Sequence, residues 1–216
     1  MITEEEITPE QKPTKQAASW RETALFILDI VINAIVIIGV AWLIKATVIT
    51  PFRVVGESMV PTLEDNDFII VDKISYRFAT PQRGNIVIVH PRNKKDFFVK
   101  RIIGLPGERI SFKEGKVFIY NDQNPEGFEL GEDYLSKENG NHTYLPDRVD
   151  KMLEIPADHY FLLGDNRLHS SDSRAWQVDD TTEEVGALPR SAIVGRAWLI
   201  VWPPQELRIL FRPAYL

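Results

Sequence analysis

The 216-residue sequence contains no cysteine. This absence excludes a disulfide framework, a cysteine nucleophile, and zinc or iron–sulfur sites held by cysteine. It leaves the redox compartment open, because a chain without cysteine folds equally well in oxidising and reducing surroundings. Any chemistry in this protein must therefore use other side chains.

Histidine is also scarce, with four residues and no H-x-x-x-H or HExxH pair, which disfavours a zinc hydrolase. The sequence has no G-x-S-x-G elbow and no phosphate-binding loop. A Ser-His-Asp triad stays possible, because its members can lie far apart in sequence. The net charge is −6, with no basic stripe and no helix-turn-helix pattern. We therefore expect no cofactor, no metal and no nucleic-acid partner.

The strongest hydrophobic feature is Ala24–Ile44, in which only Asp29, Asn33 and Gly39 are not apolar. As a helix, this segment reaches about 30 Å, the hydrocarbon thickness of a bilayer. A buried core helix is disfavoured, because soluble helices seldom stay apolar on every face. A cleaved secretory signal is disfavoured, because the run exceeds the usual ~7–15 residues and no clear A-x-A site follows. We predict an uncleaved transmembrane signal anchor over residues 20–45.

The flanks of this anchor suggest its orientation. Residues 1–19 are polar without an apolar period, which predicts a disordered tail. Positive residues are slightly more numerous before the apolar run than after it: Lys12, Lys15 and Arg21 against Lys45 and Arg53. This bias favours a cytoplasmic N-terminus, with the rest of the chain on the other side of the membrane.

Beyond the anchor, the apolar runs become short and rich in β-branched residues, and turn-forming residues separate them. The segments expected to form strands are 47–55, 68–72, 86–90, 97–103, 109–112, 117–120, 160–163 and 193–201. Few stretches of ten residues show a helical period. The sequence therefore predicts a mostly β domain over residues 46–216, preceded by a single N-terminal transmembrane helix.

The negative charge is concentrated in one part of this domain. Residues 121–160 hold ten acidic and three basic residues, so the remainder of the chain is close to neutral. The stretch 121–148 is rich in Asn, Gly and Asp with little periodicity, which indicates a solvated insertion rather than core. A metal site is the alternative, but the carboxylates lack EF-hand spacing.

Ser58 lies shortly after the anchor, within the segment Val55–Leu63. The neighbouring Gly56 and Pro61 favour a tightly turned backbone, which can expose the hydroxyl and aim an amide N–H at a nearby oxygen. An ordinary turn serine is the alternative interpretation.

Lys100 lies inside an apolar strand segment, Phe98–Ile103. Such a lysine either extends its amine to solvent, forms a salt bridge, or is desolvated for a purpose. Burial lowers the pKa of lysine and makes the neutral amine a usable base, which arginine cannot become.

A third segment, Gly164–Arg174, combines small polar residues with two arginines and two aspartates. This composition suits a tightly hydrogen-bonded loop. Taken alone, it indicates only a polar turn with a local ion pair.

Together and in this order, these segments resemble the bacterial signal peptidase I family of membrane-anchored serine–lysine proteases. The motifs are G-x-S-M-x-P-T-L at 56–63, R-G-x-I-V at 83–87, K-R-I-I-G-L-P-G at 100–107 and G-D-N-R-x-x-S-x-D-S-R at 164–174. The resemblance covers about residues 20–202. Self-cleaving repressors of the LexA type share the S-M motif, but they lack the anchor and the last motif. The resemblance implies a complex β-fold of the kind shared by signal peptidases and LexA.

The resemblance also assigns roles to individual residues. It makes Ser58 the nucleophile, Lys100 the general base and Ser170 a hydroxyl that orients the lysine amine. It makes Asp172 and Arg174 a structural ion pair under the site and gives Asp165 and Arg167 a role in supporting that loop. Substrate pockets are assigned to apolar residues: Phe52, Val54, Met59, Leu63, Ile69 and Val99.

These roles imply an enzyme that cleaves signal peptides from secretory preproteins after Ala-x-Ala-like sequences, at the surface of the bacterial cytoplasmic membrane. Its partners are then preproteins and the lipid bilayer. Gly56 stands where some members have a serine whose hydroxyl is a second oxyanion donor, so the resemblance implies no side-chain donor at this position. Two alternatives are a regulatory or self-processing Ser-Lys protease and an inactive anchored module that binds exported proteins. The acidic stretch, about 121–158, corresponds in place to a variable subdomain.

Overall fold

The computed structural model describes residues 20–47, 49–92, 94–147, 150–176 and 186–215. The chain divides into two compact units, Met1–Leu43 and Ile44–Leu216, each of which is described by itself. The expected disordered tail, residues 1–19, lies outside the described residues.

Helix α1 (Trp20–Thr47) has 28 residues, and its part up to Leu43 is the described portion of the first unit. Its stretch Trp20–Leu43 has a mean hydropathy of 2.7, and its side chains are exposed all around the helix. Asn33 donates a hydrogen bond of 2.8 Å to the backbone carbonyl of Asp29, so its polar amide is partly satisfied within the helix. Length and composition allow this helix to cross a membrane, which confirms the expected single apolar N-terminal helix.

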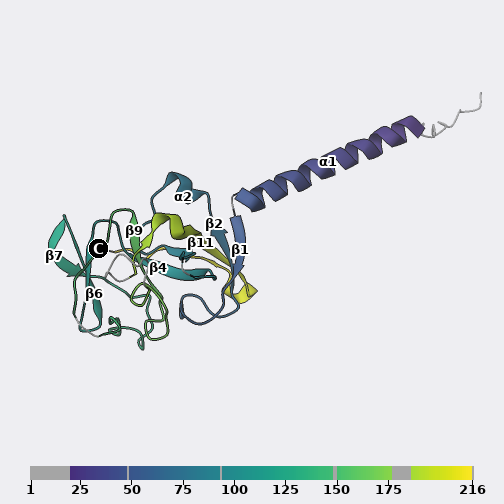
Figure 1. Cartoon of the computed structure of the whole chain (residues 1–216). Helices are drawn as coiled ribbons and strands as arrows, with labels where there is room; N and C mark the ends of the chain where they lie inside the picture. Colours follow the sequence, from purple (N-terminus) through teal and green to yellow (C-terminus); the bar gives the residue numbers. More distant parts are fainter. Residues whose placement is uncertain (1–19, 48, 93, 148–149, 177–185, 216) are drawn as a thin grey trace, which may run out of the picture. The chain divides into compact units, whose positions relative to one another are not determined.

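The second unit is built mainly from antiparallel strands (Figure 1). Its larger sheet has the order β1-β2-β11-β3-β4-β9-β10, and β12 pairs with β11. The bounds are β1 (Ile49–Arg53), β2 (Phe68–Asp72), β3 (Ile86–Val89), β4 (Phe98–Gly104), β9 (His159–Leu163), β10 (Leu188–Pro189), β11 (Ile193–Trp202) and β12 (Arg208–Ile209). Three short helices lie between strands: α2 (Ser75–Phe78), η1 (Arg190–Ala192) and η2 (Pro204–Glu206).

A smaller sheet has the order β7-β6-β5-β8. Its strands are β5 (Arg109–Lys113), β6 (Lys116–Asn121), β7 (Asn124–Glu129) and β8 (Leu153–Glu154). The turn between β5 and β6 consists of Glu114 and Gly115, both with positive φ, as a two-residue hairpin of this kind requires. A Cβ atom on Gly115 would lie 1.8 Å from the carbonyl oxygen of Asn141, so only glycine fits there.

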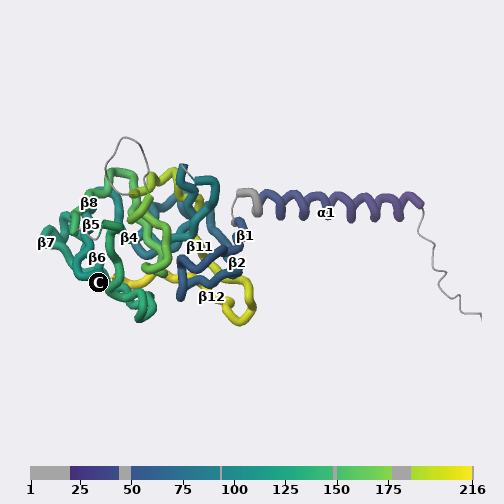
Figure 2. Tube along the Cα trace, turned by 60° about the horizontal axis from the view of Figure 1, so that its bottom comes forward, coloured from purple at the N-terminus to yellow at the C-terminus, as the bar shows by residue number. Residues whose placement is uncertain are grey.

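Both views place β6 and β7 at the end of this unit opposite to β1 and β2, with β4 between them (Figures 1 and 2). Three apolar clusters fill the unit. One lies under the smaller sheet, and the two others pack against the larger sheet. All four residues of β3 are buried, which explains why its sequence is an unbroken β-branched run rather than an alternating one.

The prediction of a mostly β fold is confirmed, and each of the eight expected strand segments overlaps a strand. Among the described residues, the strand β7 and the two-residue strands β8, β10 and β12 were not expected. The interpretation of 121–148 as solvated rather than core is wrong in part. This stretch contains β7, and its residues Leu130 and Leu145 are buried in the cluster under the smaller sheet. Burial of these two apolar side chains stabilises the packing of an otherwise polar segment against the core.

Candidate active site

Ser58 lies in the loop that joins β1 to β2. Gly56 has a φ of +87° there, and its N–H donates a hydrogen bond of 2.8 Å to the carboxylate of Asp65. The carbonyl of Met59 accepts hydrogen bonds from the N–H groups of Thr62 and Leu63, at 2.8 and 3.0 Å. This turn buries Met59 and Leu63 and leaves Ser58 half-buried. The local sequence therefore builds a tight loop that presents the serine.

Lys100 lies on β4, opposite Val87 of β3, and only 1% of its surface is exposed. Its Nζ atom is 2.7 Å from Ser58 Oγ, so the two side chains share a hydrogen bond. Burial lowers the pKa of the lysine to about 8, although the charges of Asp172 and Asp165 act in the opposite direction. A large fraction of this lysine is therefore neutral at mildly alkaline pH.

The loop Gly164–Arg174 follows β9 and packs against the Ser58 loop. Asn166 donates from its backbone N–H to the carbonyl of Ser58, at 3.0 Å, and from its side chain to the carbonyl of Glu57, at 3.1 Å. A Cβ atom on Gly164 would lie 2.2 Å from Ser170 Oγ and 2.4 Å from the Ser58 carbonyl oxygen. Glycine at this position is what allows the two loops to approach so closely.

Asp172 and Arg174 form a buried ion pair within this loop, with Arg174 Nε 2.8 Å from the carboxylate. Asp172 also accepts a hydrogen bond of 3.1 Å from the N–H of Gly164, and Arg174 donates to the carbonyl of Arg167, at 2.9 Å. Burial acts to raise the pKa of Asp172, but the bond and charge of Arg174 outweigh it and the pKa is lowered. The pair closes the loop on itself.

Asp165 pairs with Arg101, the residue after Lys100. The guanidinium lies 2.6 and 2.8 Å from the two carboxylate oxygens, and both side chains are almost fully buried. Thr62 donates its hydroxyl to the same carboxylate, and Arg101 also donates to the carbonyl of Gly84. One fully buried ion pair thus joins β4, the Ser58 loop and the Gly164–Arg174 loop.

Arg167 makes its ion pair with Glu132, which lies in the acidic stretch. The guanidinium nitrogens are 2.6 and 2.9 Å from the two carboxylate oxygens. Arg167 also donates to the Thr143 hydroxyl, at 2.7 Å, and to the Gly164 carbonyl, at 3.0 Å. Asp165 and Arg167 therefore lie in the same loop but form ion pairs with different side chains, Asp165 with Arg101 and Arg167 with Glu132.

Ser170 lies beside Gly164, and its hydroxyl oxygen is buried. The hydroxyl is near enough to Asp172 to help lower the pKa of that carboxyl. Among the described residues, however, no group is placed to form a hydrogen bond of ordinary geometry with it. This is a buried polar group with unused hydrogen-bonding capacity close to Ser58.

The six apolar residues expected to shape substrate pockets all belong to one cluster. Its buried members include Val54, Met59, Leu63 and Ile69, and the partly buried ones include Phe52 and Val99. Phe52 also contacts Phe97 edge to face, with ring centroids 5.7 Å apart. The cluster includes Met59 and Leu63 of the Ser58 loop, and the two expected pocket residues that are only partly buried, Phe52 and Val99, lie on β1 and β4.

The motifs contained several contributors to the site that carried no expected role: Gly164, Asn166, Thr62 and Arg101. Glu132 lies outside all motifs, in a stretch that the sequence distinguishes only by its acidic composition. No group of three His, Asp or Glu side chains is placed to hold a metal ion within the described part of the chain. The arrangement places a serine hydroxyl beside a buried amine. In its neutral form, the amine can deprotonate the hydroxyl for nucleophilic attack.

Comparison with known proteins points to one family. The family model described as "Signal peptidase, peptidase S26" matches residues 27–202. The chain is 34% identical to a signal peptidase I of Leptolyngbya laminosa over 214 residues, which cover 95% of each chain. It is 30% identical to signal peptidase IB of Staphylococcus aureus over 198 residues, covering 87% of this chain and 95% of that one.

Among solved structures, the chain is similar to a crystal structure of a signal peptidase I from Enterococcus faecalis. It matches with a TM-score of 0.39 and 29% identity, covering 55% of this chain and 97% of that chain.

Proposed function

The chain belongs to the signal peptidase family, peptidase S26, and is thus a serine endopeptidase that processes signal peptides; on this premise we propose that Ser58 and Lys100 carry the reaction. The observation that carries the proposal is the 2.7 Å contact between Ser58 Oγ and the Nζ atom of a lysine that is almost fully buried. A nucleophile within hydrogen-bond reach of a base of lowered pKa is what hydroxyl activation needs.

The proposed reaction has two halves. Neutral Lys100 accepts the proton of Ser58 as Oγ attacks the scissile carbonyl carbon, and the ammonium then gives that proton to the leaving amine nitrogen. The C–N bond breaks, and the new N-terminus of the mature protein departs. In the second half, Lys100 takes a proton from water, the hydroxide attacks the acyl carbon, and the ammonium returns the proton to Ser58 Oγ. The signal peptide leaves with a free carboxylate.

Oxyanion stabilisation is assigned to the backbone N–H of Ser58, a donor of a kind worth about 3–4 kcal/mol. Gly56 has no hydroxyl to add, and its own N–H already donates to Asp65. Gly56 therefore supplies no second donor in this arrangement, and its role is to give the loop the positive φ that it has.

The two buried ion pairs near the site keep the charges of the surrounding loops balanced. Asp172 with Arg174, and Asp165 with Arg101, present compensated charges to Lys100. An unpaired carboxylate there would favour the ammonium form of Lys100 and remove the base. We assign Ser170, whose hydroxyl has unused hydrogen-bonding capacity, to orienting the lysine amine.

Substrate binding is assigned to the space between β1 and β4. Along Phe98–Lys100, β4 pairs with β3 on one side, and its pairing with β9 begins only at Arg101. In the described part of the chain, β1 pairs with β2 alone. Strand edges of this kind accept an extended peptide through backbone hydrogen bonds. We assign the pockets for small side chains to the apolar cluster that contains Phe52 and Val99, in keeping with cleavage after Ala-x-Ala-like sequences.

The proposed location is the bacterial cytoplasmic membrane, with α1 as a single span among the described residues, the N-terminus in the cytoplasm and the β-rich unit outside. The helix is long and apolar enough for this role. The β-rich unit also exposes large apolar side chains on β11, β12 and the segments next to them, which suits a protein working at a lipid surface. They include Trp198, Trp202, Leu207, Ile209 and Phe211.

The experiment is cleavage of a purified preprotein with an Ala-x-Ala site by the full chain in detergent. We expect the wild type to release a signal peptide and a mature protein whose N-terminal residue follows the site, and Ser58→Ala to release neither. Cleavage of its own chain without cleavage of the preprotein would instead indicate a self-processing protease. Binding of the preprotein without cleavage would indicate an anchored binding module.

A further inference from the structure

One carboxylate of the acidic stretch, that of Glu132, is largely buried in the protein. Among the ten acidic residues of 121–160, nine have exposed side chains, whereas the Glu132 side chain is 11% exposed. Composition marked this stretch as a solvated insertion, but Glu132 behaves differently from its neighbours. The position of its partner shows why.

That partner is Arg167, which lies in the loop beneath Ser58 and is 2% exposed. The contact is bidentate, with Arg167 Nη2 2.6 Å from one carboxylate oxygen and Nη1 2.9 Å from the other. Tyr134 donates its hydroxyl to Glu132, at 2.8 Å, and accepts a hydrogen bond of 3.2 Å from Arg167. Thr143, also in the acidic stretch, accepts a further bond of 2.7 Å. Paired arrangements of this kind fix both distance and direction.

A second contact joins the same two segments. The buried side chain of Asn139 accepts a hydrogen bond of 3.1 Å from the backbone N–H of Leu168. The acidic stretch therefore holds the loop at two successive residues, Arg167 through its side chain and Leu168 through its backbone.

From Arg167 the contacts continue to the reacting serine. Its Nε atom donates to the carbonyl of Gly164, at 3.0 Å, and Gly164 packs directly against the Ser58 carbonyl and Ser170. The backbone N–H of Asn166, the preceding residue, donates to the Ser58 carbonyl. A change in the position of Arg167 therefore displaces the backbone that supports Ser58.

We propose that Glu132 is a positioning residue for this protease: through Arg167 it sets how closely the Gly164–Arg174 loop is held against the Ser58 loop. The inference rests on the proposed function of Ser58 and Lys100. It gives the acidic stretch a part in the reaction although none of its side chains is assigned to touch the substrate.

Charge explains why a carboxylate is needed at this position. Burial by itself acts to lower the pKa of Arg167, but the charge of Glu132 outweighs it and the pKa is raised. The two carboxylates of the loop itself are already paired, Asp165 with Arg101 and Asp172 with Arg174. Without Glu132, Arg167 would be a buried cation that has lost its paired carboxylate, which is strongly unfavourable.

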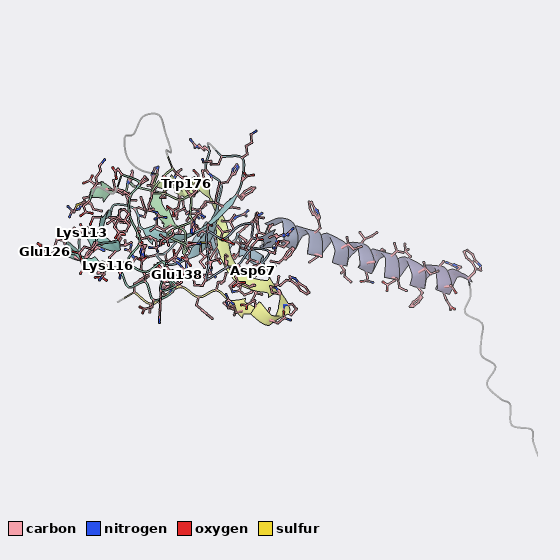
Figure 3. The ribbon with its side chains drawn as sticks, turned by 90° about the horizontal axis from the view of Figure 1, so that it is seen from below. Asp67, Lys113, Lys116, Glu126, Glu138 and Trp176 are labelled. Carbon is pink, nitrogen blue, oxygen red and sulfur yellow. The ribbon has the colours of Figure 1, made fainter. Side chains whose placement is uncertain are left out.

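The test compares two variants with a charge-matched control. Glu132→Gln keeps the size of the side chain and removes its charge, and Tyr134→Phe removes only the hydroxyl that joins Glu132 and Arg167. The control is Glu138→Gln, an exposed residue of the same stretch that is labelled in Figure 3. Preprotein cleavage in detergent gives kcat and KM, and hydrogen exchange reports on the amides of 164–174. Ser58→Ala is measured in parallel, so that the proposed function is tested independently of Glu132.

For Glu132→Gln we expect kcat to fall about 10- to 100-fold, KM to stay within about twofold, and exchange in the loop to accelerate. Tyr134→Phe should lower kcat by about 2- to 10-fold, and Glu138→Gln should match the wild type. If the wild type cleaves and Ser58→Ala does not, an unchanged kcat for folded Glu132→Gln overturns the positioning role alone. If Glu132→Gln does not fold, the result for Tyr134→Phe decides, and an unchanged kcat there overturns the proposal.

Discussion

The Nζ atom of Lys100 lies 2.7 Å from the Oγ atom of Ser58, a residue 42 positions earlier in the chain. Their elements are not neighbours in the sheet, because β2, β11 and β3 lie between β1 and β4 in the strand order. The contact depends on the long Ser58 loop reaching Lys100, where Asn166 and Gly164 support it.

Removing either member of this pair should abolish cleavage. Ser58→Ala and Lys100→Ala should each lower preprotein cleavage by about 10⁴-fold or more, since neither remaining group can complete the reaction. Lys100→Arg should fail as well, because arginine does not release its proton. The measurement is product formation by gel with matched amounts of folded enzyme, judged by thermal unfolding. Wild-type activity in any of the three would refute the assignment of the pair.

The rate should depend on pH as the titration of Lys100 dictates. The active form is the neutral amine, and burial lowers the pKa of the lysine to about 8. The kcat/KM for cleavage should therefore rise from acidic pH towards a plateau above pH 8, with an apparent pKa near that value. Initial rates over this range provide the measurement, and a profile that is flat from pH 5 to 9 would argue against a lysine base.

Some residues of the candidate site could be predicted from the sequence, whereas others are evident only in the structure. Ser58 and Lys100 could be selected from sequence because each lies in a distinctive motif. The partner of Asp165 could not, because Arg101 is 64 residues away and an ion pair between distant segments leaves no local pattern. The role of Glu132 could not be predicted from the sequence for a related reason. Composition does not distinguish it from the other nine acidic residues of the stretch, and only the structure shows that its side chain is largely buried. The two-residue strands β8, β10 and β12 are too short to show a period.

Lys100 should reduce the stability of the fold that it serves. Its pKa is about 8 in the folded protein against an ordinary value of 10.5, so below pH 8 the folded state bears the cost of a buried ammonium. Between these values the unfolded chain binds more protons, and stability rises with pH. Lys100→Met should therefore be inactive yet more stable at pH 7, by about 1–3 kcal/mol, and this gain should shrink towards pH 10. Denaturant unfolding at both pH values tests this, and a variant less stable than the wild type at pH 7 would contradict it.

Gly164 should tolerate no side chain. An added methyl group would lie 2.2 Å from Ser170 Oγ and 2.4 Å from the Ser58 carbonyl oxygen, so Gly164→Ala must push the two loops apart. We expect a loss of about 1–3 kcal/mol in unfolding free energy and a fall of about 100-fold in kcat. The matched control is Gly140→Ala, where the nearest atoms are at ordinary distances of 3.7 and 3.8 Å. Equal effects of the two substitutions on kcat would show that the close approach at Gly164 is unimportant.

Ser170 offers a way to separate catalysis from stability. Its hydroxyl is buried and, among the described residues, makes no hydrogen bond of ordinary geometry, so Ser170→Ala should cost the fold little. The free energy of unfolding should change by less than about 1 kcal/mol. If the hydroxyl orients the Lys100 amine, kcat should still fall by about 10- to 100-fold, because a base that rotates freely is less often aligned with Ser58 Oγ. Steady-state kinetics and unfolding of the same preparation provide both numbers. A loss of stability with no change in kcat per folded molecule would make Ser170 a packing residue. The Lys100 amine would then be oriented by its hydrogen bond to Ser58 and by the side chains packed around it, without help from Ser170.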